Sequence, residues 1–214
     1  MNKVSEIHNM PMLWDGPIAS ETLLILAHGA GSPMDTPFMT YLAQHIADHK
    51  IRVLRFEFPY MALRRKTKTK RPPNPQQILL TSWRTIIDHY ASSYKRLFVG
   101  GKSMGGRMAS MVADDCMVDG LICIGYPFYA AGKPEKTRIS HLQNLNTRTL
   151  FLQGERDQTG SKDIVKTYPL SSSIKVSWIA DGNHDLKPRV KTGLSQADNL
   201  EKAFNEIVKF IRNK

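Results

Sequence analysis

A short segment between an apolar run and a helical pattern limits what this chain can fold into. Residues 101–105 read Gly-Lys-Ser-Met-Gly and fit the pattern G-x-S-x-G. In that pattern a sharp strand-to-helix turn holds the serine in a strained conformation, with its hydroxyl exposed above the edge of a sheet. The apolar run 96–99 precedes the turn, and Met108, Met111 and Val112 follow it at helical spacing. The context therefore predicts that Ser103 is a nucleophile at such a turn.

The same residues also resemble the end of a phosphate-binding loop, G-x-x-x-x-G-K-[ST]. Gly101, Lys102 and Ser103 match its last three positions. The pattern also requires a glycine five residues before Gly101, where this chain has Arg96. We therefore favour the nucleophile interpretation over phosphate binding.

Strand-like and helical segments alternate along the chain, which predicts an α/β fold with a doubly wound, mostly parallel sheet. We expect strands over residues 22–27, 51–58, 96–99, 120–124, 148–153 and 174–180, the last near the sheet edge. We expect helices over residues 37–49, 75–90, 107–113 and 197–212, and the helix over 75–90 should direct Ile78, Leu79, Trp83, Ile86 and Ile87 inward. The length suits one domain, residues 1–214. Only the short segment 126–147 has room for a lid, so we expect a minimal lid or none.

A serine nucleophile needs a base to take its proton and an acid to orient that base. In sheets of this type the order along the chain is serine, then acid, then histidine, each at the carboxyl end of a strand. His184 follows the last predicted strand and is the only histidine after the candidate acids. Asp157 is the preferred acid over Glu155. The loop after the strand starts at Gly154 and needs a few residues to turn toward the histidine, and Asp157 lies further along it than Glu155. Asp163 is the fallback.

The tetrahedral intermediate of acyl transfer also requires two hydrogen-bond donors aimed at its oxyanion. We expect one to be the backbone N–H of Met104, the residue after the nucleophile. The second should come from the loop after an earlier strand, which here reads His28-Gly29-Ala30-Gly31, and we assign it to the N–H of Ala30. His28 itself is expected to fix this loop by hydrogen bonds.

The net charge of +11 raises the question of nucleic-acid binding. Much of this charge falls between Arg64 and Arg71, a segment expected to be a solvated loop that ends in Pro72-Pro73-Asn74-Pro75. No aromatic residues alternate with these charges and no nucleic-acid-binding signature is present, so a nucleic-acid partner is not expected. The simplest function for such a loop would be to attract anionic substrates by its charge.

The remaining composition favours a cytoplasmic protein. The first eight residues lack the apolar stretch of a secretory signal, and no run is long enough to span a bilayer. Cys116 and Cys123 lie in or beside an apolar strand and are expected to be reduced, small hydrophobic residues. No histidine spacing indicates a metal site, so we expect no metal and no organic cofactor.

Several segments together resemble a small α/β-hydrolase family, over roughly residues 23–187. They are Leu26-Ala27-His28-Gly29-Ala30-Gly31, Phe56-Glu57-Phe58-Pro59-Tyr60-Met61, residues 101–110, Gly125-Tyr126-Pro127, Gly132-Lys133-Pro134 and residues 153–157. The family includes bacterial dienelactone-hydrolase-like proteins and animal testis-expressed and nonspecific-lethal-complex subunit proteins. The resemblance implies an α/β-hydrolase fold with Ser103, Asp157 and His184 at the matching catalytic positions, and implies that the basic segment is ordered near the site. True dienelactone hydrolases carry a cysteine nucleophile, so a dienelactone substrate is not expected.

Together these observations predict a serine hydrolase that cleaves a carboxylic ester or thioester through an acyl-enzyme on Ser103. The alternative is a hydrolase-like binding or scaffold protein without significant turnover, which the animal relatives suggest. The sequence leaves open the acyl chain, the leaving group and the oligomeric state.

Overall fold

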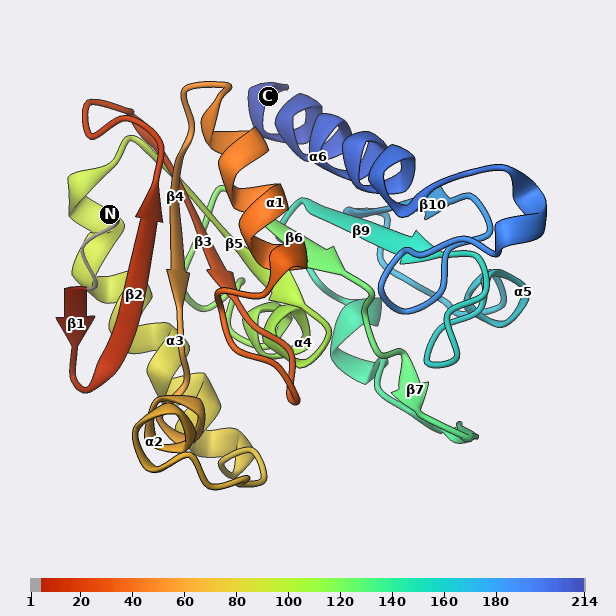
Figure 1. Ribbon diagram of the computed structural model, residues 1–214, viewed down its shortest axis with the longest axis horizontal. Helices are drawn as coiled ribbons and strands as arrows, with labels where there is room; N and C mark the ends of the chain where they lie inside the picture. Colours follow the sequence, from red (N-terminus) through yellow and green to blue (C-terminus); the bar gives the residue numbers. More distant parts are fainter. Residues whose placement is uncertain (1–4, 214) are drawn as a thin grey trace.

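The computed structural model describes residues 5–213 and contains one eight-stranded, mostly parallel sheet (Figure 1). The strand order is β1-β2-β4-β3-β5-β6-β9-β10, and the strands from β4 to β10 run parallel to one another, whereas β1 and β2 are antiparallel to their neighbours. The strands of this sheet are β1 Ser5–Ile7, β2 Met10–Asp15, β3 Thr22–Ala27, β4 Arg52–Phe56, β5 Arg96–Lys102, β6 Gly120–Ile124, β9 Thr149–Gly154 and β10 Ile174–Ile179.

Helices cover both faces of the sheet, as the continuous apolar run along β3 requires. Leu23 and Ile25 of that strand belong to one hydrophobic cluster, together with residues of α3 and α4, whereas Leu24 and Leu26 belong to the opposite cluster with α1 and α6. The helices are α1 Pro37–Ala47, α2 Pro59–Thr67, α3 Gln76–Tyr90, α4 Met104–Ser110, α5 Lys162–Val165 and α6 Gln196–Arg212, with short 3-10 turns at Ala91–Ser93, Ser140–Gln143 and Val190–Thr192. The predicted doubly wound architecture is confirmed, and β10 lies at the sheet edge as expected.

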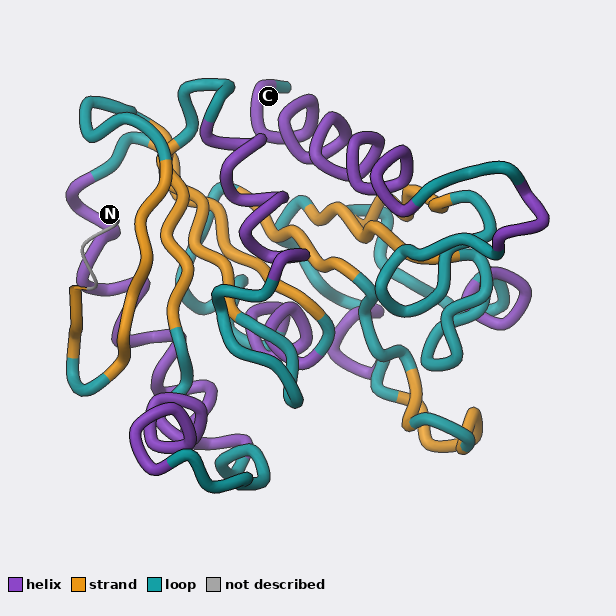
Figure 2. The backbone as a smooth tube through the Cα atoms, viewed as in Figure 1, coloured by secondary structure: helices purple, strands orange, loops and turns teal. Residues whose placement is uncertain are grey.

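The strand order reverses direction in the middle of the sheet. The chain passes from β3 to β4 on one side and then returns to β5 on the other side of β3. Crevices for ligands form at such a switch point, beyond the carboxyl ends of the strands. The loop after β3, drawn as a teal tube between β3 and α1 in Figure 2, and the turn after β5 both leave the sheet there.

The segment predicted to have room for a lid, residues 126–147, forms a small hairpin and the 3-10 turn Ser140–Gln143. Strand β7 Tyr129–Ala130 pairs with β8 Lys133–Thr137 in a separate two-stranded sheet, and all five residues of β8 are exposed. Figure 1 shows this hairpin projecting beside the main sheet. The expected minimal lid is confirmed.

The basic segment 64–71 is only partly a loop, so the expectation of a continuous loop is wrong. Helix α2 includes Arg64, Arg65 and Lys66 in its last turn, and Lys68 ends it in the left-handed region at φ 57°. Pro59 at the first helical position favours the helix because its φ is already fixed. Cations in the last turn then interact favourably with the negative end of the helix dipole.

Two further local features differ from the sequence-based expectations. The antiparallel hairpin β1–β2 was not predicted; its two-residue turn is His8-Asn9, both at positive φ (48° and 61°), as a tight hairpin turn requires. In α3, Ile78 is 43% exposed, so its inward assignment is wrong. Leu80, two residues further along the helix, is buried in its place.

Candidate active site

The predicted turn around Ser103 joins β5 to α4 in a strained backbone conformation. Ser103 has φ 52° and ψ −116°, outside the regions that a non-glycine residue normally occupies. A side chain at Gly105 would place its Cβ 2.7 Å from the carbonyl oxygen of His28 and closer still to that of Ala27. Only glycine therefore allows α4 to start this close to the end of β3.

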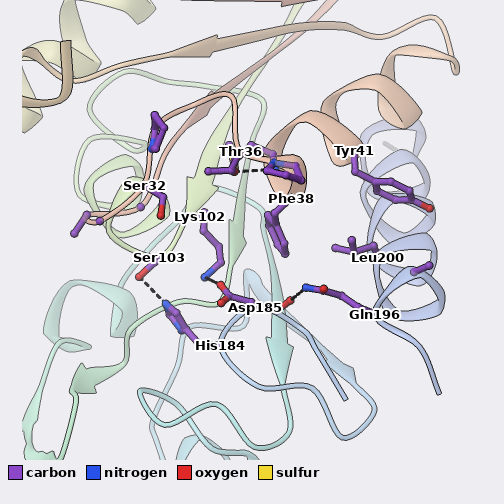
Figure 3. Close-up of a pocket in the computed structure, with 17 residues that line it drawn as sticks. Ser32, Thr36, Phe38, Tyr41, Lys102, Ser103, His184, Asp185, Gln196 and Leu200 are labelled. Atoms are coloured by element: carbon purple, nitrogen blue, oxygen red, sulfur yellow. Dashed lines mark hydrogen bonds and ion pairs between the residues drawn. The ribbon is translucent and has the colours of Figure 1, made fainter. Parts of the chain in front are cut away.

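The structure brings Ser103, His184 and Asp157 together in one hydrogen-bonded chain. The Oγ of Ser103 lies 2.9 Å from Nε2 of His184, and Nδ1 of His184 lies 2.8 Å from Oδ2 of Asp157 (Figure 3 shows the first of these bonds). An ionised carboxylate only accepts, so Nδ1 of His184 carries the proton. Nε2 is then left with its lone pair toward the Ser103 hydroxyl, which is the arrangement needed for a base.

Asp157 is fully buried and remains an acid of low pKa. Burial acts to raise the pKa of this carboxyl, but hydrogen bonds from His184 and from the backbone and side chain of Thr159 outweigh it and hold the pKa below its ordinary value. The Nε2 of Gln153 also donates to Oδ2 at 3.0 Å. Asp157 is therefore charged at neutral pH and can stabilise an imidazolium at His184.

The two rival carboxylates lie elsewhere. Glu155 pairs with Lys162 at 2.6 Å and accepts the backbone N–H of Asp181, and these contacts lower its pKa. Asp163 is exposed in the short helix α5. Of the three candidate acids, the structure joins Asp157 to the histidine.

A cavity of about 850 Å3 opens beside Ser103 (Figure 3). Its wall consists of the loop after β3, the start of α1 and the start of α6, with Phe38, Tyr41 and Leu200 as its large apolar side chains. Ser103 and His184 line it together with Lys102 and Asp185. The candidate nucleophile thus faces a space large enough for a small organic molecule.

A family model described as an alpha/beta hydrolase domain matches residues 20–212. The chain belongs to the α/β-hydrolase family. An alpha-beta serine hydrolase homologue from Coxiella burnetii has a similar structure, with 17% identity, a TM-score of 0.74, and coverage of 99% of this chain and 97% of that one. A lidless serine hydrolase from Xanthomonas campestris, XC6422, has 15% identity and a TM-score of 0.71 over 96% of this chain and 91% of its own. The esterase Est1E from Butyrivibrio proteoclasticus, with ferulic acid bound, has 13% identity and a TM-score of 0.66 over 92% and 95%. At these identities the likeness establishes the α/β-hydrolase fold.

The two residues predicted to donate to the oxyanion are Met104, directly after Ser103, and Ala30, in the loop after β3. Met104 is the first residue of α4, where backbone N–H groups have no partner within the helix. Ala30 lines the same cavity as Ser103, and its carbonyl oxygen accepts the hydroxyl of Tyr60 at 2.8 Å. The preceding Gly29 comes close to the turn, since a Cβ there would lie 3.7 Å from the Cβ of Ser103.

His28 fixes the backbone of this loop, in line with its expected structural role. Its Nε2 accepts the backbone N–H of Phe58 at 3.2 Å, so Nδ1 carries the proton and donates to the carbonyl of Gly29 at 2.6 Å. Burial lowers the pKa of His28 and favours this neutral form.

Sequence reasoning missed two features of this α/β-hydrolase, one in the site and one outside it. Lys102 was considered only as part of a phosphate-binding pattern, although a lysine between a buried strand and a nucleophile signals a cation in the site. The pair of Ser110, the last residue of α4, and His141, 2.9 Å apart, was also missed because no spacing rule connects residues so far apart in the chain.

Neither a metal cluster nor a membrane-spanning helix is found in the described residues 5–213. Within this range, no three His, Cys, Asp or Glu side chains are grouped so that they could hold a metal ion. No helix in this range is long and apolar enough to cross a membrane.

Proposed function

We propose that this protein is a serine hydrolase that cleaves a carboxylic ester or thioester through an acyl-enzyme on Ser103. The hydrogen-bonded chain from Ser103 through His184 to the buried Asp157 carries the proposal. The family match and the serine hydrolases of similar fold support a hydrolase. The choice of ester or thioester rests on the chemistry that such a triad performs.

In the proposed reaction each group has its own step. The Oγ of Ser103 bonds to the acyl carbon while Nε2 of His184 takes its proton, and Asp157 stabilises the resulting imidazolium. The N–H groups of Met104 and Ala30 donate to the oxyanion. His184 then gives the proton to the departing alcohol or thiol. A water molecule, deprotonated by His184, then bonds to the acyl carbon. The bond from that carbon to Oγ breaks, His184 returns the proton to Oγ, and the acid leaves.

The proposed substrate is a small molecule that enters the cavity beside Ser103, whose lining includes no residue of the described β7–β8 hairpin. We further propose a cytoplasmic location and a closer kinship with the dienelactone-hydrolase-like branch of the family. Both rest on the sequence features described above.

Covalent labelling tests the proposal directly. A fluorophosphonate probe should label the wild-type protein on Ser103 and should not label Ser103→Ala. Ser110→Ala is a matched control, because Ser110 also contacts a histidine but is only 2% exposed, and it should label like the wild type. Equal labelling of Ser103→Ala, or no labelling of the wild type, would refute the assignment.

A series of p-nitrophenyl esters of increasing acyl length then separates an enzyme from the alternative of a binding or scaffold protein. Turnover that Ser103→Ala abolishes supports the hydrolase. Absence of turnover for every acyl length would favour the scaffold.

A further inference from the structure

The side chain of Lys102 is a buried cation directed into the cavity beside the nucleophile. Lys102 is the last residue of β5 and is only 8% exposed. Its Nζ lies 3.1 Å from Oδ1 of Asp185, the residue after His184. Figure 3 shows the Lys102 side chain between Ser103 and Phe38, with its end on Asp185.

The surroundings of the Lys102 ammonium give it little access to water. Its Nζ lies 5.7 Å from the centre of the Phe38 ring and 3.4 Å from the position of a Cβ at Gly125. Burial lowers the pKa of Lys102, whereas the charge of Asp185 opposes this effect. An ammonium in such surroundings requires an anionic partner, because an unpaired buried charge is costly.

The two members of this ion pair differ strongly in exposure. The side chain of Lys102 is 10% exposed, whereas that of Asp185 is 64% exposed. Asp185 can therefore turn into solvent and be rehydrated at little cost, but Lys102 cannot. A carboxylate that enters the cavity can replace Asp185 on Lys102 without leaving a buried charge unpaired.

We propose that Lys102 binds a carboxylate of the substrate, so that the enzyme prefers half-esters or half-thioesters of short dicarboxylic acids. This inference rests on the proposed function of Ser103. The two residues are adjacent in sequence and line one cavity, so a short acyl chain can present its ester to Ser103 and its acid to Lys102. A carboxylate fits better than a phosphate, because the single ammonium of Lys102, once Asp185 has turned away, balances one negative charge rather than nearly two.

The test compares two esters that differ in charge but hardly in shape. Monoethyl glutarate carries the carboxylate, and ethyl glutaramate replaces it with a neutral amide. The measured quantity is the ratio of kcat/KM for the acid ester to that for the amide ester. The wild type should favour the acid ester, and Lys102→Met should lower the ratio about 10- to 100-fold, the range of a buried hydrogen bond to a charged group.

Two further variants sharpen the test. Asp185→Asn removes the competing carboxylate, so its ratio should rise above that of the wild type. Lys95→Met is a matched control, because Lys95 is an exposed lysine that pairs with Glu21 just before the other end of β5, and it should leave the ratio unchanged.

Equal losses for both esters in Lys102→Met would mean that Lys102 only supports the site, and would overturn the inference while leaving the serine hydrolase intact. A wild-type ratio of one or below would also overturn it. If no ester is cleaved and no probe labels Ser103, the proposed function itself fails. Calorimetric titration of glutarate into Ser103→Ala and into the Ser103→Ala/Lys102→Met double variant then tests the carboxylate site alone. Equal binding to both proteins would overturn it, and weaker binding to the double variant would support it.

Discussion

Replacement of Asp157 by asparagine keeps the shape of the side chain but reverses part of its hydrogen bonding. The carboxylate receives four donors within hydrogen-bond distance. Oδ1 accepts the backbone N–H and the hydroxyl of Thr159, each at 2.8 Å, and Oδ2 accepts Nδ1 of His184 at 2.8 Å and Nε2 of Gln153 at 3.0 Å. An asparagine has one oxygen, so its NH2 group must face one of these two pairs of donors.

Neither orientation of the asparagine amide in Asp157→Asn satisfies all of these groups. If the NH2 faces Thr159, it opposes a backbone N–H that cannot accept. If it faces His184, the imidazole can avoid the clash only by moving its proton to Nε2, which then points at Ser103 as a donor. Gln153 cannot turn its amide to help, because its oxygen accepts the backbone N–H of Tyr126 at 2.8 Å.

We expect the NH2 of the asparagine to face His184, because this orientation keeps the hydrogen bond from the backbone N–H of Thr159. In this orientation His184 can no longer act as a base toward Ser103. The loss of kcat should be about 10³- to 10⁴-fold, or about 4–5.5 kcal/mol in the barrier, as for a triad histidine held in the wrong tautomer. The new NH2 group then also faces the NH2 of Gln153, which stays bonded to the carbonyl oxygens of Tyr126 and Gly160. Two buried donors in contact should lower the free energy of unfolding by about 1–3 kcal/mol. Steady-state kinetics with a p-nitrophenyl ester and urea unfolding measure the two effects separately.

Asp163→Asn provides the matched control, because Asp163 is the exposed fallback acid on α5. It should retain wild-type kinetics. The reasoning would be refuted if folded Asp157→Asn kept its kcat within about tenfold of the wild type, or if Asp163→Asn lost activity instead.

Two predictions concern stability. Gly105→Ala places a Cβ against the backbone oxygens of Ala27 and His28, so its free energy of unfolding in urea should fall by about 3 kcal/mol or more. Gly31→Ala is the control, because a Cβ there meets nothing within 4 Å, and it should unfold like the wild type. Burial lowers the pKa of His141 from 6.5 to about 4, and the charge of Arg107 adds a smaller effect in the same direction. Between these two pH values the imidazole therefore binds a proton in the unfolded chain but not in the folded protein. Stability should therefore fall as the pH drops through this window. His141→Gln should remove up to about 1.4 kcal/mol per pH unit of this slope, measured by urea unfolding at several pH values; an unchanged slope would contradict the burial argument.

Sequence alone located most of the sheet and the candidate site because both depend on local patterns. The run 22–27 is β3 residue for residue, and Thr36 caps α1 by accepting the N–H of Met39 at 3.3 Å. Asp157 and His184 were found because parallel strands bring the residues after their carboxyl ends to one edge. The choice of Asp157 over Glu155 agrees with the contacts in the structure, although its catalytic role stays a prediction.

The missed features depend on long-range packing. Ile78 has the spacing of an inward residue, but the face of α3 that packs on the sheet is shifted so that Leu80 is buried instead. Arg65 is held at the end of α2 by Glu57 and by Asp35, and Asp35 belongs to a distant loop. The sequence therefore showed only a run of charges, where the structure has a helix that ends against the loop after β3.

The lysine of the Gly-Lys-Ser segment illustrates how context decides the meaning of a motif. In a phosphate-binding loop that lysine faces phosphate groups from a glycine-rich turn. Here Lys102 is still part of β5, where it pairs with Ile124 of β6, so its backbone is extended and Ser103 rather than a loop makes the turn. The ammonium is therefore held in the wall of the cavity, and Asp185 supplies the negative charge that a phosphate would supply in the other motif. Lys102, which made the sequence motif ambiguous, is thus the residue on which the preference of the enzyme for a charged substrate should depend.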